Sequence, residues 1–206
     1  MHEGSIVLAK PQSSEKLILL FHGVGSSAQD LAPLGEALAQ ARPSDVVISV
    51  QAPYPSQLGR GQEWFSVIGV TEENRPNRIA LVMPLFLKTI RHWQDITGID
   101  AKDTVLIGFS QGSIMALEAT QTPESMAGKV IAMAGRFAQP ARQAPSDMQV
   151  HLIHGDRDGV IAPQWSTQAL QEIKALGGKV TLDQFPGLGH GIDARVVQQV
   201  IHYLTP

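Results

Sequence analysis

The sequence TVLIGFSQGSIMALE (residues 104–118) sets the architecture expected of this chain. Its apolar first part predicts a strand over Thr104–Phe109, and its second part predicts a helix over Ser110–Thr120. The pentapeptide Gly108-Phe109-Ser110-Gln111-Gly112 stands at the junction and matches Gly-x-Ser-x-Gly. A sharp strand-to-helix turn of this kind exposes a nucleophilic serine hydroxyl above the sheet. The alternative is that Ser110 only caps the helix; the setting between strand and helix favours the nucleophile.

On both sides of this stretch, short apolar runs alternate with amphipathic segments along the chain. This pattern predicts the α/β class, with a mostly parallel sheet of about seven strands covered by helices on both faces, in a single domain spanning residues 1–206. The other predicted strands are Ser5–Ala9, Lys16–Phe21, Val46–Gln51, Lys129–Ala134, Gln149–His154 and Lys179–Phe185. The other predicted helices are Ala28–Ala41, Asn77–Gln94 with a kink at Pro84, Pro163–Leu176 and Asp193–Leu204.

Two segments, 52–76 and 135–147, are too long for ordinary loops and are candidates for binding or lid elements. Composition limits the chemistry elsewhere. The chain has no cysteine, which excludes disulfides, thiolate metal sites and a cysteine nucleophile. A net charge of −3 without a basic stripe argues against a nucleic-acid partner or an anionic membrane surface. The N-terminal residues lack the features of a signal peptide, and the run Leu17 to Phe21 is strand-sized, so we expect a cytoplasmic protein without membrane insertion.

A serine nucleophile requires a base and an acid, and after such a turn the acid comes next in the chain and the histidine last. His190 lies in the glycine-rich loop 187–191, between the last predicted strand and the last helix. Such a loop can hold an imidazole at the carboxyl edge of the sheet. His202 falls in the terminal helix, and His151 and His154 lie on opposite faces of one strand, where they cannot share a metal ion. His190 is therefore the predicted base.

The acid is expected directly after the strand Gln149–His154. Asp158 and Asp156 are the two candidates there, and Asp158 is preferred because related hydrolases place the acid four residues after the histidine of a His-Gly-x-x-Asp pattern. Asp156 could instead cap the turn. Asp193 is expected to cap the last helix.

Two backbone amides are needed for an oxyanion hole, and Gln111, which follows the serine, is expected to supply one. The second is expected from Val24, in the glycine-rich turn that follows the strand Lys16–Phe21. A phosphate-binding loop is the alternative for this turn, but no Lys-Ser or Lys-Thr pair follows the glycines.

Together, five motifs in order along the chain resemble the phospholipase/carboxylesterase family of α/β-hydrolases, which includes acyl-protein thioesterases. Within this family, the chain resembles the bacterial YpfH-type esterases. The motifs are 20–25 (LFHGVG), 63–66 (EWFS), 108–112 (GFSQG), 154–158 (HGDRD) and 189–191 (GHG). The resemblance implies an α/β-hydrolase fold without a large cap domain, and no metal or cofactor. It also implies that Trp64 and Phe65 line the acyl pocket, although core packing is equally compatible with these two residues. Ser66 replaces an Asp typical of acyl-protein thioesterases, which favours a general esterase.

The sequence therefore predicts a serine carboxylesterase that hydrolyses small-molecule esters, with thioesters as a second substrate class. The catalytic residues would be Ser110, His190 and Asp158, acting through an acyl-enzyme intermediate. A catalytically silent fold that binds a small molecule is one alternative, and an acyltransferase or perhydrolase with the same triad is another. A homodimer is compatible with the sequence.

Overall fold

The computed structural model describes residues 3–144 and 147–205, and its centre is a seven-stranded sheet. The order across the sheet is β1-β3-β2-β6-β7-β8-β9, and every neighbouring pair is parallel except β1 with β3. The strands are β1 Ile6–Ala9, β2 Leu17–Phe21, β3 Val46–Val50, β6 Thr104–Phe109, β7 Lys129–Met133, β8 Gln149–Gly155 and β9 Lys179–Phe185. All seven predicted strands are confirmed.

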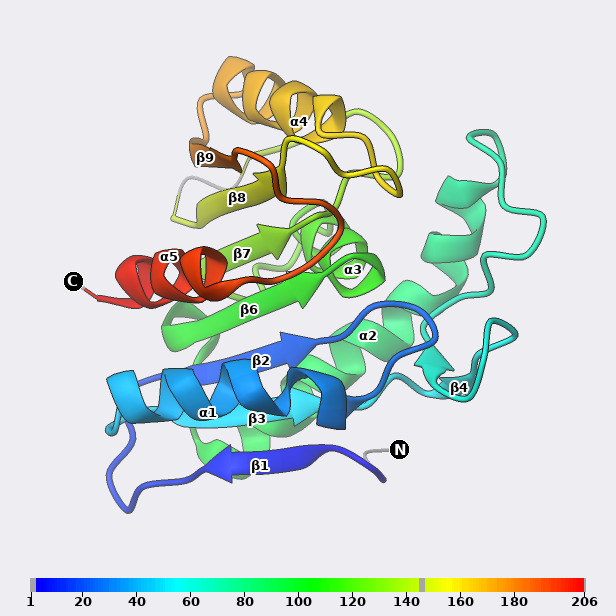
Figure 1. Ribbon diagram of the computed structural model, residues 1–206. Helices are drawn as coiled ribbons and strands as arrows, with labels where there is room; N and C mark the ends of the chain where they lie inside the picture. The colour runs from blue at the N-terminus through cyan, green and yellow to red at the C-terminus, as the bar shows by residue number, and fades with distance from the viewer. Residues whose placement is uncertain (1–2, 145–146, 206) are drawn as a thin grey trace.

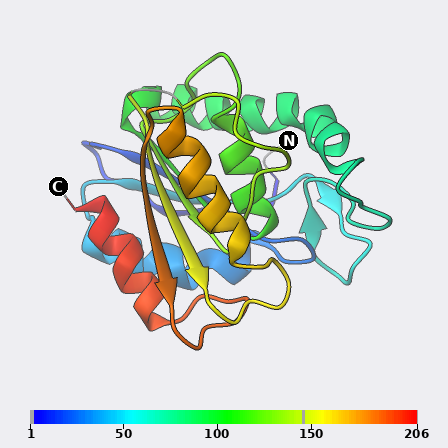
Figure 2. The same cartoon turned by 90° about the horizontal axis from the view of Figure 1, so that it is seen from above.

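Helices cover both faces of the sheet, as the apolar strands require (Figure 1). Figure 2 shows α2, α3 and α4 on one side and α1 and α5 on the other. The helices are α1 Ala32–Ala41, α2 Arg75–Thr97, α3 Gln111–Ala119, α4 Gln164–Ala175 and α5 Ala194–Leu204, with short 3-10 helices η1 Ala28–Leu31 and η2 Ala101–Asp103. The predicted α/β fold, without a large cap domain, is confirmed.

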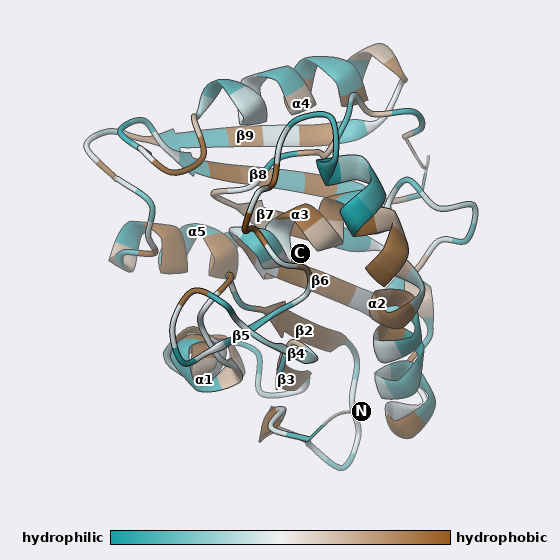
Figure 3. Cartoon of the chain, turned by 90° about the vertical axis from the view of Figure 1, so that its right-hand side faces the viewer, coloured by the Kyte–Doolittle hydropathy of each residue, from teal (hydrophilic) through white to brown (hydrophobic). Residues whose placement is uncertain are grey.

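Strand β2 shows how the two cores arise from one apolar run, since successive side chains of a strand point to opposite faces. Leu17, Leu19 and Phe21 pack under α2 and α3, whereas Ile18 and Leu20 pack under α1 and α5. All five are fully buried. In Figure 3 the central strands β2 and β6 are correspondingly brown, whereas the helices alternate between brown and teal along their length.

The structure differs from the predicted elements mainly at the helix ends and in segment 52–76. The helix predicted over Ala28–Ala41 begins with η1 before α1, and α2 extends beyond both predicted ends. Pro84 lies within α2 without ending it, and Figure 1 shows the helix bending along its length. Segment 52–76 contains two short antiparallel strands, β4 Tyr54–Pro55 and β5 Gln62–Glu63, which periodicity could not reveal at this length.

Four loops that carry candidate residues leave the sheet at the same edge. They follow β2, β6, β8 and β9, all parallel, so their carboxyl ends meet on one side. None of the described helices is both long and apolar enough to cross a bilayer.

Candidate active site

Ser110 occupies the turn between β6 and α3 in a strained backbone conformation, with φ 54° and ψ −115°. Only glycine adopts this region easily. The turn is tight because α3 starts directly on top of neighbouring strands. A Cβ on Gly108 would lie 2.4 Å from the Ser113 nitrogen, and a Cβ on Gly112 would lie 2.1 Å from the Phe21 carbonyl oxygen. Both flanking glycines of the Gly-x-Ser-x-Gly pattern are therefore required by close packing.

The strain at Ser110 predicts an unusual stability order between two variants that both lack the hydroxyl. We expect Ser110→Gly to be more stable than Ser110→Ala by about 1 kcal/mol, because a positive φ costs about 1–3 kcal/mol for a residue with a Cβ and the greater unfolded-state entropy of glycine offsets part of this. Urea unfolding of the two variants measures the difference. If the alanine variant were as stable as the glycine variant, the backbone at residue 110 would not be strained in the alanine variant, and the prediction would be wrong.

His190 lies between Ser110 and Asp158 and contacts both. Its Nε2 is 2.9 Å from the Ser110 Oγ, and its Nδ1 is 2.7 Å from the Asp158 Oδ2. An ionised carboxylate can only accept a hydrogen bond, so Nδ1 carries the proton and Nε2 is free to accept from the serine hydroxyl. The Phe109 ring, 5.0 Å from the imidazole between centroids, packs beside the base.

Asp158 is buried, and each of its carboxylate oxygens is held. Oδ1 accepts hydrogen bonds from the Val160 and Ile161 amides at 2.8 and 2.9 Å, while Oδ2 faces His190. Burial alone would raise the pKa of Asp158, but the hydrogen bonds from His190 and from the two amides outweigh it and hold the pKa below its ordinary value. The carboxylate is therefore ionised at neutral pH.

His154, which the sequence placed only on a strand, supports Asp158. Its Nε2 lies 3.2 Å from the Asp158 Oδ2 and donates to the Ile161 carbonyl at 2.8 Å, and its Nδ1 accepts from the Ser166 hydroxyl. Burial lowers the pKa of His154, which keeps this imidazole neutral. The signal that could have found this role is the spacing of four residues between His154 and Asp158.

The other candidates lie elsewhere. The Asp156 carboxylate accepts from the Gly187 amide at 2.7 Å and so holds the loop that carries His190. Asp193 caps α5 as expected, accepting from the Arg195 and Val196 amides. His151 stacks on Tyr203, away from the site. Among residues 3–144 and 147–205, no group of three or more histidine or acidic side chains could hold a metal ion.

The two expected oxyanion donors, Val24 and Gln111, both line the cleft that contains Ser110. Within the described part of the chain, neither amide donates to a protein acceptor. The turn after β2 is fixed by His22, whose Nδ1–H donates to the Gly23 carbonyl and whose Nε2 accepts from the Ala52 amide. Burial lowers the pKa of His22, so this linkage uses the neutral imidazole.

The cleft beside Ser110 has a volume of about 290 Å³ and mostly apolar walls. It is lined by Val24, Leu58, Phe65, Val67, Val70, Arg75, Ser110, Gln111, Ile114, Arg136, Val160, Ile161 and Trp165. Phe65 thus lies where the resemblance implied. Trp64 does not line the cleft: it is 1% exposed and packs edge-on against Phe21 and Phe86 in the core. The Trp64 indole fills the space between β2 and α2. Of the two roles that the sequence allowed for Trp64, pocket lining and core packing, the structure therefore shows core packing.

The Gln111 side chain has a structural role that its position in the motif did not indicate. Its Oε1 accepts from the Trp64 amide and its Nε2 donates to the Phe65 carbonyl, both at 2.7 Å. Gln111, the first residue of α3, therefore fixes the backbone of Trp64 and Phe65, and Phe65 is part of the cleft wall.

Comparison with known proteins identifies the family to which this chain belongs. The phospholipase/carboxylesterase family model matches residues 2–206. Esterase YpfH of Escherichia coli K12 is 40% identical over 203 residues, covering 98% of this chain and 88% of that protein. Acyl-protein thioesterase 1 of Neurospora crassa is 24% identical over 91% of this chain and 85% of its own. The crystal structure of esterase PE8 superposes with a TM-score of 0.87 at 28% identity, covering 97% and 95% of the two chains. The chain therefore belongs to the phospholipase/carboxylesterase family of hydrolases.

Proposed function

We propose that this protein is a serine carboxylesterase that hydrolyses carboxylic esters, with thioesters as a second substrate class, through an acyl-enzyme on Ser110. The observation that carries the proposal is the continuous hydrogen-bond chain from Asp158 through His190 to the Ser110 hydroxyl, in a cleft that Val24 and Gln111 also line. The esterases and thioesterases among its relatives support the same chemistry.

In the first half of the proposed reaction, the Ser110 Oγ attacks the ester carbonyl carbon while its proton passes to the His190 Nε2. Asp158 stabilises the imidazolium that forms, and the amides of Val24 and Gln111 donate to the negative carbonyl oxygen. The tetrahedral intermediate then collapses. The bond to the leaving oxygen or sulfur breaks, and the leaving group takes the proton from His190.

In the second half, a water molecule loses a proton to His190 and attacks the acyl carbon. The bond from carbon to the Ser110 Oγ breaks, the serine recovers its proton from His190, and the carboxylic acid leaves. Since the N-terminus of α3 points at this position, the helix dipole adds to the stabilisation of both oxyanions.

Pre-steady-state hydrolysis of p-nitrophenyl acetate tests the acyl-enzyme directly. We expect a burst of p-nitrophenol approaching one equivalent of enzyme, because acylation by an activated ester usually outruns hydrolysis of the acyl-enzyme. No hydrolysis would favour the silent binding protein. A rate that rises when an alcohol or hydrogen peroxide is added, with the acyl group found on that acceptor, would favour the acyltransferase or perhydrolase.

The pH dependence of kcat/KM follows from the ionisation states of the proposed base and acid. Hydrogen bonds from His190 and from the Ile161 and Val160 amides hold the pKa of Asp158 below its ordinary value, so its carboxylate stays charged over the pH range of the rate measurements. A histidine base accepts the serine proton only when it is neutral, so we expect kcat/KM to fall at acid pH through the base and not through Asp158. Initial rates between pH 5 and 9 measure this, and a flat profile would contradict a histidine base.

A further inference from the structure

The charged groups of the cleft are unbalanced. Two of its lining residues, Arg75 and Arg136, are cationic, and no acidic residue lines it. Asp158, the nearest acid of the proposed machinery, is already held by His190 and two amides and does not line the cleft. A cation beside an otherwise apolar cleft costs free energy unless an anion compensates it.

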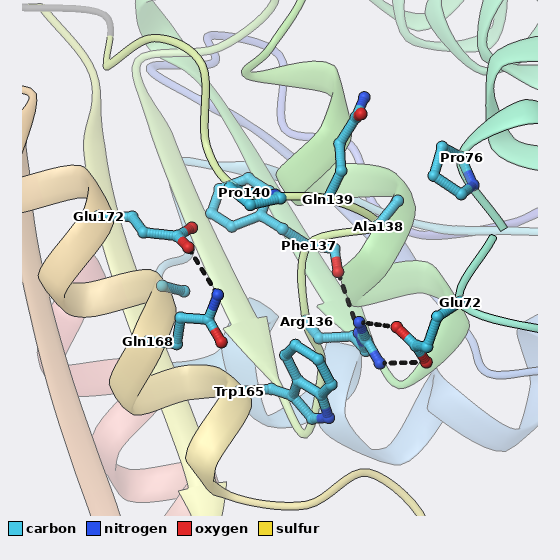
Figure 4. Close-up of a pocket in the computed structure, with 11 residues that line it drawn as sticks. Glu72, Pro76, Arg136, Phe137, Ala138, Gln139, Pro140, Trp165, Gln168 and Glu172 are labelled. Atoms are coloured by element: carbon cyan, nitrogen blue, oxygen red, sulfur yellow. Dashed lines mark hydrogen bonds and ion pairs between the residues drawn. The ribbon is translucent and has the colours of Figure 1, made fainter.

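Arg136 is fully engaged by the protein (Figure 4). Its Nη1 and Nη2 donate to the two carboxylate oxygens of Glu72 at 2.9 and 2.6 Å, its Nε donates to the Phe137 carbonyl, and its guanidinium lies 3.3 Å above the Trp165 ring. The side chain is 8% exposed. Arg136 therefore forms a fixed wall between the cleft and a second cavity of about 380 Å³, which Ser110 does not line.

Arg75 is the less engaged of the two. Its Nη1 donates to the Glu72 Oε1 at 2.6 Å, the oxygen that also accepts from the Arg136 Nη1, and its side chain is 15% exposed. One carboxylate thus serves two guanidinium groups, which leaves one formal positive charge. Glu72 itself is 61% exposed, so solvent weakens its compensation. Arg75 is also the first residue of α2, a 23-residue helix with no acidic residue in its first turn, and the positive end of the helix dipole adds to the charge.

We propose that this corner of the cleft binds a carboxylate of the substrate, so that the preferred substrate is an ester that carries a free carboxylate at the far end of an apolar chain. A guanidinium matches a carboxylate in shape and charge. Ser110 and Arg75 line the same mostly apolar cleft, which accommodates the chain, and a volume of about 290 Å³ limits it to a short one. This inference rests on the proposed esterase function and specifies its substrate class.

Two pairs of esters, each differing only by a methyl group on the remote carboxylate, test the inference. One pair is mono-4-nitrophenyl adipate and methyl 4-nitrophenyl adipate, with the charge on the acyl side. The other is 4-acetoxybenzoate and its methyl ester, with the charge on the leaving group. We expect the wild-type enzyme to favour the anionic member of at least one pair, and Arg75→Gln to lower that ratio of kcat/KM by about 10- to 100-fold. Arg75→Lys should retain part of the preference.

Arg91→Gln is the matched control, since Arg91 lies on the same helix outside the cleft and pairs with Glu124; it should leave the ratio unchanged. If Arg75→Gln folds poorly, the salt dependence of the wild-type enzyme tests the same charge interaction. Added NaCl should raise KM for the favoured anionic ester and not for its neutral methyl ester. Equal kcat/KM within both pairs, or a preference that neither Arg75→Gln nor salt reduces, would overturn the inference. Absence of hydrolysis of all four esters would instead refute the esterase function itself.

Discussion

Replacing Ser110 by Ala is expected to lower kcat for p-nitrophenyl ester hydrolysis by about 10⁶-fold, the scale of loss when a serine hydrolase loses its nucleophile. The physical reason is that no other hydroxyl stands within hydrogen-bond distance of the His190 Nε2 among the described residues, so no side chain can take over the attack. Residual turnover would come from the cleft and the two amides acting on water. Steady-state kinetics of purified variants measure the loss.

We expect His190→Ala to lower kcat about as much as Ser110→Ala, and the double variant to be no slower than either, because the two groups act as one unit. Multiplicative losses in the double variant would mean that Ser110 and His190 contribute independently, which contradicts a nucleophile activated by its base. Circular dichroism spectra of the three variants control for folding.

Asp158→Asn is the second substitution with a large expected effect. We expect it to lower kcat by about 10⁴-fold with little change in fold. The asparagine oxygen can still accept from the Val160 and Ile161 amides, which leaves its NH₂ group facing His190. A group that only donates forces the Nδ1 to accept, so the proton moves to the Nε2. In that tautomer the imidazole cannot take the proton of Ser110.

Asp156→Asn is the matched control for this loss, since Asp156 lies two residues away, carries the same charge and accepts a hydrogen bond from the Gly187 amide instead. We expect its kcat to stay within about threefold of wild type, because an amide oxygen accepts from Gly187 almost as well. If the two asparagine variants lost the same activity, the assignment of Asp158 as the acid would be wrong.

The strands and most helices were predictable because burial on both faces of a parallel sheet leaves a direct trace in the sequence. The run Leu17 to Phe21 is apolar without interruption for this reason. The Gly-x-Ser-x-Gly turn is visible in the sequence because a Cβ on either glycine would lie only 2.1–2.4 Å from a neighbouring atom, so only glycine fits. The meeting of Ser110, His190 and an acid after β8 at one edge followed from chain order and loop position, since parallel strands end at one edge. The choice of Asp158 over Asp156 needed the His-Gly-x-x-Asp pattern of related hydrolases.

What could not be predicted depends on contacts between distant segments. Nothing in the local sequence indicates that the Gln111 side chain holds residues 64 and 65, or that Arg136 stacks on Trp165 and pairs with Glu72. Trp64 and Phe65 are adjacent aromatic residues, yet one fills the core and the other lines the cleft. Their different surroundings are set by the segment 52–76, whose short strands are too brief to show a periodic pattern.

Labelling with a fluorophosphonate tests whether Ser110 is an activated nucleophile, because this reagent reacts with a serine only when a base and oxyanion donors activate it. We expect a single adduct by intact mass, located on Ser110 by peptide mapping, and no adduct in folded Ser110→Ala or His190→Ala. An unlabelled wild-type protein, or an adduct that persists when Ser110 is alanine, would contradict the assignment of Ser110 as the nucleophile.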